Sequence, residues 1–201
     1  GWSTETHKPY LVPISYKIFE KSTGRELIPE SLLELTEPKT TVEYEIGQNI
    51  PVLSVLRGLS APVKLYIDRE SEELAALARF DDDGVSRWDA MQALYVRAIK
   101  NRLPGNEWNP VELIATVRGL IESETSIQDE ACLAEMLTLP QSNVLWDEFQ
   151  PADPQAIACA RNEVMADLGK GLFTQWEVLF SKMQILEEYQ PISSQIGKRS
   201  L

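Results

Sequence analysis

The residues best suited to chemistry in this sequence are one histidine, two cysteines and 31 acidic side chains. A zinc peptidase site of the HExxH kind needs two histidines one helical turn apart, with a glutamate between them as the general base. The chain has only His7, in a polar N-terminal stretch, so no such site can be assembled. The same shortage leaves Cys132 and Cys159 without a base to activate them as nucleophiles. We therefore expect no catalytic residue, no cofactor-binding residue and no metal ligand in this chain.

The run of aspartates at residues 81–83 resembles part of a calcium-binding EF-hand loop. In that register the first and last ligand positions fall on Arg79 and Ala90, which cannot bind calcium. The run is instead predicted to be a solvated turn that caps a helix. Ser86, with Asp89 three residues later, has the spacing of a capping box and is the predicted N-cap.

The tryptophans of the helical region and both cysteines fall on apolar stretches and are predicted to pack in the core rather than bind a ligand. They are Trp88, Trp146, Trp176, Cys132 and Cys159. Trp88 shares a helical stripe with Met91 and Tyr95, so we expect it to be buried against neighbouring helices. Its replacement by alanine would then cost about 3–5 kcal/mol.

The composition is that of a folded protein, with 201 residues of which 43% are hydrophobic. The net charge of −12 argues against nucleic acid or an anionic membrane as a partner. The sequence shows no run long enough to span a membrane and no signal peptide, and its two cysteines show no metal-ligand spacing. These features favour a cytoplasmic location.

The chain changes from strand periodicity to helical periodicity near residue 68. Upstream, alternating apolar residues predict short strands at residues 10–20, 25–29, 32–35, 40–46, 51–56 and 61–67. Downstream, spacings of three and four predict helices at residues 70–80, 86–102, 109–121, 126–137, 143–149 and 154–189, and the start of another at 192–201. Asp153 is the predicted cap of the longest of these helices, with Pro154 at its first position. Gly169 and Gly171 could divide this helix in two. The predicted fold class is α+β, mainly α: a small antiparallel β-sandwich at residues 1–68, followed by an α-helical array at residues 69–201.

Several motifs occur together in one order. They are IPV at residues 50–52 with LSAPVKL at 59–65, RWDAMQAL at 87–94, EMLTLP at 135–140, DP at 153–154 and IGKRSL at 196–201. This ordered set resembles the zinc aminopeptidase N family of gluzincin metalloaminopeptidases, at the junction where a β-sandwich domain meets a large helical domain. The resemblance runs from about Tyr10 to the end of the sequence.

The resemblance implies a fragment downstream of the catalytic domain, with an incomplete sandwich and only the first part of a solenoid-like helical domain. The family's HExxH and GxMEN motifs are absent from the sequence, so no catalytic residue carries over. In the parent enzyme, zinc would belong to the catalytic domain, which would be this chain's partner. The helical part would cover the active site, and peptide substrates would be met only through the parent. A stand-alone helical interaction module without enzymatic activity is the alternative.

Overall fold

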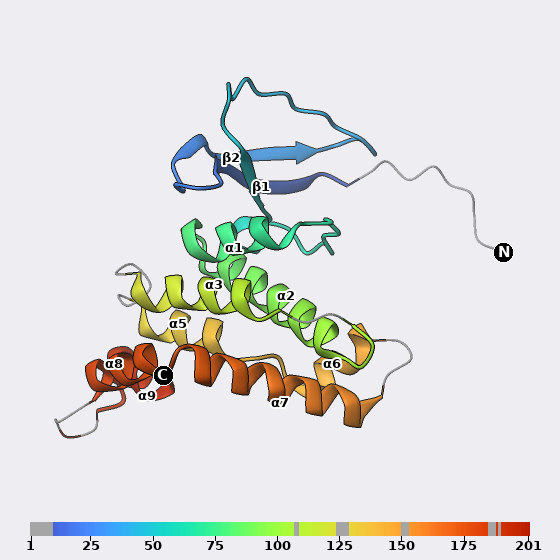
Figure 1. Cartoon of the computed structure of the whole chain (residues 1–201). Coiled ribbons are helices and arrows are strands. Elements are labelled where there is room, and N and C mark those ends of the chain that lie inside the picture. Colours follow the sequence, from blue (N-terminus) through green and yellow to red (C-terminus); the bar gives the residue numbers. More distant parts are fainter. Residues whose placement is uncertain (1–9, 107–108, 124–128, 150–152, 185–187, 189) are drawn as a thin grey trace. The chain divides into compact units, whose positions relative to one another are not determined.

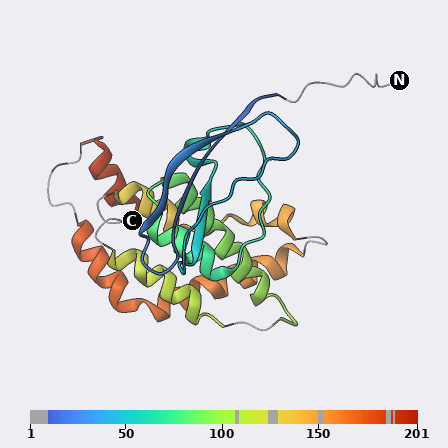
Figure 2. The same cartoon turned by 90° about the horizontal axis from the view of Figure 1, so that it is seen from above.

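Strands form where apolar side chains alternate and a neighbouring strand completes the hydrogen-bond ladder. The computed structural model of the chain describes residues 10–106, 109–123, 129–149, 153–184, 188 and 190–201. Within them, three strands form one antiparallel sheet in the order β2-β1-β3, seen in the blue and teal part of Figures 1 and 2. They are β1 (Val12–Glu20), β2 (Glu26–Leu35) and β3 (Pro51–Val55). Helices make up the rest of the regular structure, which confirms the predicted fold class.

The central strand β1 contains an irregularity that the sequence pattern does not show. Its register with β2 shifts on both sides of Ile18, so strict alternation fails there. Phe19, which is out of phase with Ile14 in the alternating pattern, is buried like Ile14 and pairs with the equally buried Val52 of β3. Pro29 lies in β2, an edge strand of the sheet, where a residue without an N–H group is tolerated.

The turn between β1 and β2 requires glycine at residue 24. Gly24 has a φ of +70°, and a Cβ atom there would lie 2.7 Å from the Cβ atom of Phe80. The Glu20 carboxylate closes the same turn by accepting hydrogen bonds from the N–H and hydroxyl groups of Ser22 and Thr23, at 2.8–3.0 Å. These hydrogen bonds lower the pKa of Glu20.

Two predicted strands, residues 40–46 and 61–67, are not strands in the structure. Most of their alternating apolar residues stay exposed: Val42 at 46%, for example, and Leu65 at 43%. Alternation marks one apolar face, but a strand also needs a neighbouring backbone to bond with, and neither segment pairs with one among the described residues. The predicted strands at 25–29 and 32–35 are one continuous strand, β2.

The chain divides into two compact units, residues up to Ser86 and residues from Arg87 onward. The first unit holds the sheet, a 3-10 turn (Arg57–Leu59) and α1 (Ser71–Phe80). Leu74, Leu77 and Ala78 of α1 are buried, as their spacing predicts. The division falls within the first turn of α2 (Gly84–Arg102), and the domain boundary expected after residue 68 stays a prediction.

The second unit is helical, and its helices follow the predicted segments closely. Beyond α2 they are α3 (Val111–Glu122), α5 (Glu130–Leu137), α6 (Ser142–Glu148), α7 (Pro154–Gly171), α8 (Phe173–Met183) and α9 (Ser193–Ser200). The predicted cap of the longest segment is confirmed, since the Asp153 carboxylate accepts hydrogen bonds from the N–H groups of Gln155 and Ala156 at 3.0 and 3.1 Å. The start predicted for α5, residue 126, lies outside the described residues.

The long predicted helix is two helices, α7 and α8, with a break at Leu172 (φ −124°, ψ 21°). Gly171 precedes the break, and a Cβ atom there would lie 2.6 Å from the Cδ1 atom of Ile114 in α3. The glycine therefore permits close packing of α3 against the end of α7. Large side chains that are almost fully buried form the core of this unit: Met91, Tyr95, Ile99, Leu120, Leu133, Met136, Leu145, Ile157 and Leu172.

Candidate functional site

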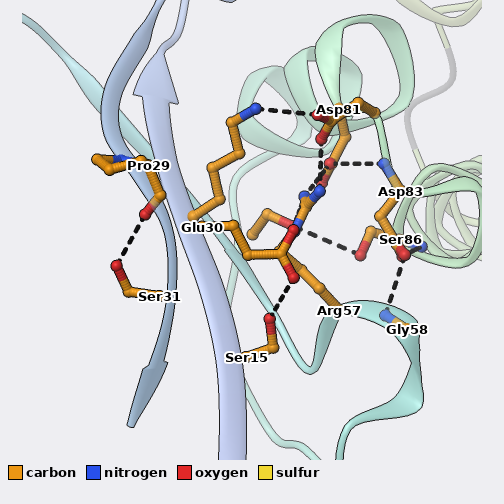
Figure 3. A network of polar contacts seen from close by, with 12 residues as sticks. Ser15, Pro29, Glu30, Ser31, Arg57, Gly58, Asp81, Asp83 and Ser86 are labelled. Carbon is orange, nitrogen blue, oxygen red and sulfur yellow. Dashed lines mark hydrogen bonds and ion pairs between the residues drawn. The ribbon is translucent and has the colours of Figure 1, made fainter.

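The most extensive polar arrangement in the first unit is centred on Arg57, whose side chain is only 5% exposed. Its Nε atom donates to the Glu30 carboxylate at 3.1 Å and its Nη1 atom to the Ser54 hydroxyl at 3.1 Å. Nη1 also donates to Asp81 (Figure 3), and Nη2 donates to Asp82. The guanidinium group thus joins β2, β3 and the turn between α1 and α2 through charge-assisted hydrogen bonds.

The third strand, β1, extends this arrangement. Lys17 of β1 forms ion pairs with Asp82 at 3.0 Å and with Glu26 at 3.2 Å. The Ser15 hydroxyl donates to Glu30 at 2.7 Å. We call the group formed by Lys17, Glu30, Ser54, Arg57 and Asp81–Asp83 the Arg57 cluster.

Asp83 connects the cluster to the start of α2. One carboxylate oxygen accepts a hydrogen bond from the N–H of Ser86 at 2.8 Å, and the other accepts one from the N–H of Gly58 at 3.0 Å (Figure 3). Asp83 therefore caps α2, which begins at Gly84, and the predicted cap at Ser86 is wrong. The aspartate run therefore caps a helix, as predicted, but the turn is only partly solvated: the side chain of Asp82 is 64% exposed, whereas that of Asp81 is fully buried.

Mutual neutralisation sets the protonation states within the cluster. Burial alone would raise the pKa of Asp82, but hydrogen bonds from Lys17 and Arg57 outweigh it and lower that pKa to about 2. Hydrogen bonds from Ser15 and Arg57 lower the pKa of Glu30. Burial would lower the pKa values of Lys17 and Arg57, yet their carboxylate partners raise both. Every one of these groups is held in its charged form at neutral pH.

The cluster is suited to holding chain segments together rather than to catalysis. It is made of paired charges and hydroxyl groups, without a histidine or cysteine. One carboxylate oxygen of Asp81 is buried without a hydrogen-bond partner in the described part of the chain. Because an uncompensated buried charge is costly, Asp81 depends on Arg57. Within the first unit, the arrangement holds β2, β3 and the turn after α1 together.

Acidification is expected to weaken the first unit through Asp82 and Glu30. Their pKa values in the folded chain lie below the ordinary 3.8 and 4.5. Folding therefore favours the ionised carboxylates, and their contribution, complete above about pH 5, is lost as the pH falls towards about 2. The urea concentration at the midpoint of unfolding should therefore decrease as the pH is lowered from about 5 to about 2, and it should decrease less for Asp82→Asn than for the unmodified chain. Asp68→Asn, at an exposed position of the same unit, is the control, and equal slopes for all three proteins would contradict the assignment.

The structure corrects several predictions about core residues. Trp88 is 41% exposed and Trp146 is 43% exposed, so neither is a core residue. Cys159 is also exposed, whereas Cys132 is partly buried. Trp176 is partly buried, and its indole N–H donates to the carbonyl of Leu168 at 3.3 Å. His7 lies outside the described residues.

Sequence reasoning missed Arg57, Glu30 and Lys17 as a group. A signal was present, because Arg57 interrupts the apolar run of residues 50–63. An arginine in such a run must either reach solvent or find carboxylates when the strands bury it. The distant aspartates at residues 81–83 supply them, and only the folded chain shows this pairing.

Side chains that could bind a metal ion do not cluster in the described part of the chain. Among them, no three His, Cys, Asp or Glu side chains converge in a group that could hold one. None of the described helices is both long enough and apolar enough to cross a membrane.

The combination of a small antiparallel sheet and a following helical array matches two family models. Residues 71–201 match the domain of unknown function DUF3458_C, described as ARM repeats. Residues 2–68 match the domain of unknown function DUF3458, described as an Ig-like fold. The chain belongs to the DUF3458_C family of ARM-repeat domains.

Individual relatives of this chain are named aminopeptidase N, and they confirm the resemblance to that family. Aminopeptidase N of Caulobacter vibrioides is 31% identical over 181 residues, which cover 89% of this chain and 21% of the relative. Aminopeptidase N of Escherichia coli is 28% identical over 207 residues, which cover 96% of this chain and 23% of the relative. The crystal structure of Legionella pneumophila aminopeptidase A in complex with aspartic acid superposes on this chain with a TM-score of 0.79 and 25% sequence identity. The superposition covers 94% of this chain and 23% of the Legionella chain.

Proposed function

We propose that this chain is the non-catalytic strand-and-helix part of a zinc-dependent aminopeptidase of the N type, an enzyme that removes N-terminal amino acids from peptides. The proposal rests on how much of this chain, and how little of its relatives, is matched. Nearly the whole chain matches its relatives, yet it spans only 21–23% of their length. The sequence contains neither HExxH nor GxMEN, so the chemistry belongs to another part of such an enzyme.

In this proposal the partner is the catalytic domain of the parent enzyme, which also holds the zinc ion. The helical array covers the active site and controls the access of peptides, which the chain meets only through the parent. Nucleic acid and membranes are not partners, which agrees with the net charge of −12.

A chimera tests this role. The matched segment of Caulobacter vibrioides aminopeptidase N, about a fifth of that protein, is replaced by this chain. We expect the chimera to hydrolyse alanine and leucine chromogenic amides, and the same enzyme without the segment to lose at least about 90% of its activity. The isolated chain, dialysed against zinc, should neither retain stoichiometric metal nor cleave the amides.

Two outcomes would contradict the proposal. One is zinc-dependent turnover by the isolated chain that survives His7→Ala. The other is a chimera that is folded by circular dichroism and sedimentation but as inactive as the enzyme without the segment. The coding sequence upstream of residue 1 gives a separate check: HExxH there supports the proposal, and its absence supports the stand-alone interaction module.

A further inference from the structure

Two tyrosines of the first unit meet at their hydroxyl groups. Tyr16 lies in β1, where it pairs with Ser31 of β2 on one side and with Val55 of β3 on the other. Tyr44 lies in residues 36–50, which connect β2 to β3 without a helix or strand. The two hydroxyl groups are hydrogen-bonded, and the ring centroids are 6.4 Å apart with an angle of 45° between the ring planes. We call these two residues the Tyr16–Tyr44 pair.

One ring of the pair is carried by a fixed backbone, and the other is free to adjust. Tyr16 belongs to the central strand of the sheet, which has a neighbouring strand on each side. In the described part of the chain, residues 36–45 make no backbone hydrogen bond to the sheet, and the Tyr44 hydroxyl provides their side-chain hydrogen bond to it. Tyr44 is 39% exposed and Tyr16 is partly exposed. A small movement of this connection therefore brings the rings together, at a place that an oxidant in solvent can reach.

We propose that the Tyr16–Tyr44 pair is a site of oxidative cross-linking, at which a carbon–carbon bond joins the two rings as dityrosine. The co-reactant is hydrogen peroxide, with a haem peroxidase as the one-electron oxidant. Each phenol loses one electron and its hydroxyl proton, and the two phenoxyl radicals join at ring carbons next to the C–O carbons. The hydrogen on each joined carbon then moves to the oxygen and restores the phenol. One peroxide is reduced to two waters, and the pair loses two hydrogen atoms.

The geometry of the pair favours both steps of this reaction. A phenol loses an electron more readily when its proton passes at once to an acceptor, and the neighbouring hydroxyl is within reach to accept it. Because the fold holds both rings together, the coupling step is intramolecular, which raises the effective concentration of one radical for the other. Tyr10 and Tyr66 are more exposed, at 87% and 79%, but neither is paired with another aromatic ring in the described part of the chain.

The cross-link would tie the connection between β2 and β3 to the central strand. It would close a covalent loop over residues 16–44. A covalent link across such a loop stabilises the folded chain mainly by restricting the unfolded chain, as a disulfide does. This inference does not depend on the proposed enzymatic role.

Oxidation of the full chain tests the inference. The cysteines are first alkylated, the chain is treated with hydrogen peroxide and a haem peroxidase, and dityrosine is followed by its fluorescence. We expect a monomeric product whose yield per chain is unchanged when the chain is diluted about tenfold, because the coupling is intramolecular. A yield that falls with dilution, as in coupling between molecules, would overturn the proposal.

Mass spectrometry locates the cross-link. Trypsin cuts after Lys17, Lys39 and Arg57, so the expected product joins the peptides of residues 1–17 and 40–57. Its mass should be the sum of the two peptide masses less two hydrogen atoms. The first peptide also contains Tyr10, so fragment ions must place the link on Tyr16. A link on Tyr10 would refute the assignment.

Conservative variants give a second check. Tyr16→Phe and Tyr44→Phe each remove one phenol and retain the ring, and each should lower the dityrosine fluorescence at least about tenfold. Tyr66→Phe, at a more exposed position, should leave the fluorescence unchanged, and circular dichroism should show that all three variants are folded. After oxidation, the unmodified chain should unfold at a higher urea concentration than oxidised Tyr44→Phe. Equal fluorescence losses in all three variants, or a cross-link that survives Tyr44→Phe, would contradict the proposal.

Discussion

Replacement of Arg57 by methionine is expected to destabilise the sheet-containing unit by about 3–5 kcal/mol. The side chain of Arg57 is 5% exposed, and that of its partner Asp81 is fully buried. Without the guanidinium group, the Asp81 carboxylate would stay buried with one oxygen that already lacks a hydrogen-bond partner. The free energy of unfolding should be measured by urea titration with circular dichroism, and hydrogen exchange of the β1 amides should report the loss in this unit.

Two further variants show whether the loss of stability comes from the unpaired buried charge of Asp81 or from removing any arginine. Arg25→Met removes an exposed arginine that hydrogen-bonds Asn49, and should cost less than about 1 kcal/mol. The double variant Arg57→Met with Asp81→Leu should recover part of the stability, because an apolar pair can replace a buried ion pair at little cost. A loss below about 1 kcal/mol for Arg57→Met alone would show that the cluster does not hold the unit together.

Replacement of Met91 by alanine is expected to cost about 2–5 kcal/mol, because it opens a cavity in the core of the helical unit. Met91 is fully buried beside the fully buried Tyr95 on the same helical stripe. Burial raises the pKa of Tyr95, as expected for a phenol shielded from water. The measurement is the free energy of unfolding from urea titration, followed by tryptophan fluorescence.

Trp88, three residues earlier on α2, is the matched comparison. Its side chain is 41% exposed, so Trp88→Ala removes contacts but leaves no closed cavity. We expect it to cost less than about 2 kcal/mol, although tryptophan is much larger than methionine. If Trp88→Ala costs more than Met91→Ala, the placement of the first turn of α2 is wrong.

The order of elements was readable from the sequence because local rules govern it. Apolar spacing located α1 and most of the later helices, and the Asp153-Pro154 pair marked the start of α7. The glycines near residue 170 anticipated the break before α8. The ordered motifs also indicated the family, since they are a property of the sequence alone. Periodicity requires only neighbouring residues, which explains its success here.

Tertiary structure decided what depends on residues far apart in the chain. Residues 40–46 and 61–67 alternate like strands, yet a strand forms only when another backbone supplies hydrogen bonds. Trp88 lies on the same side of α2 as Met91, yet only Met91 is buried. Periodicity predicts which side of a helix faces its neighbours, but not whether a neighbour covers the whole length of that side. Arg57 pairs with Asp81, 24 residues away, because the fold buries both charges and burial makes an unpaired charge too costly. The sequence thus determines most of the helices and the family, and the folded chain determines which strands form and which charges and apolar faces meet.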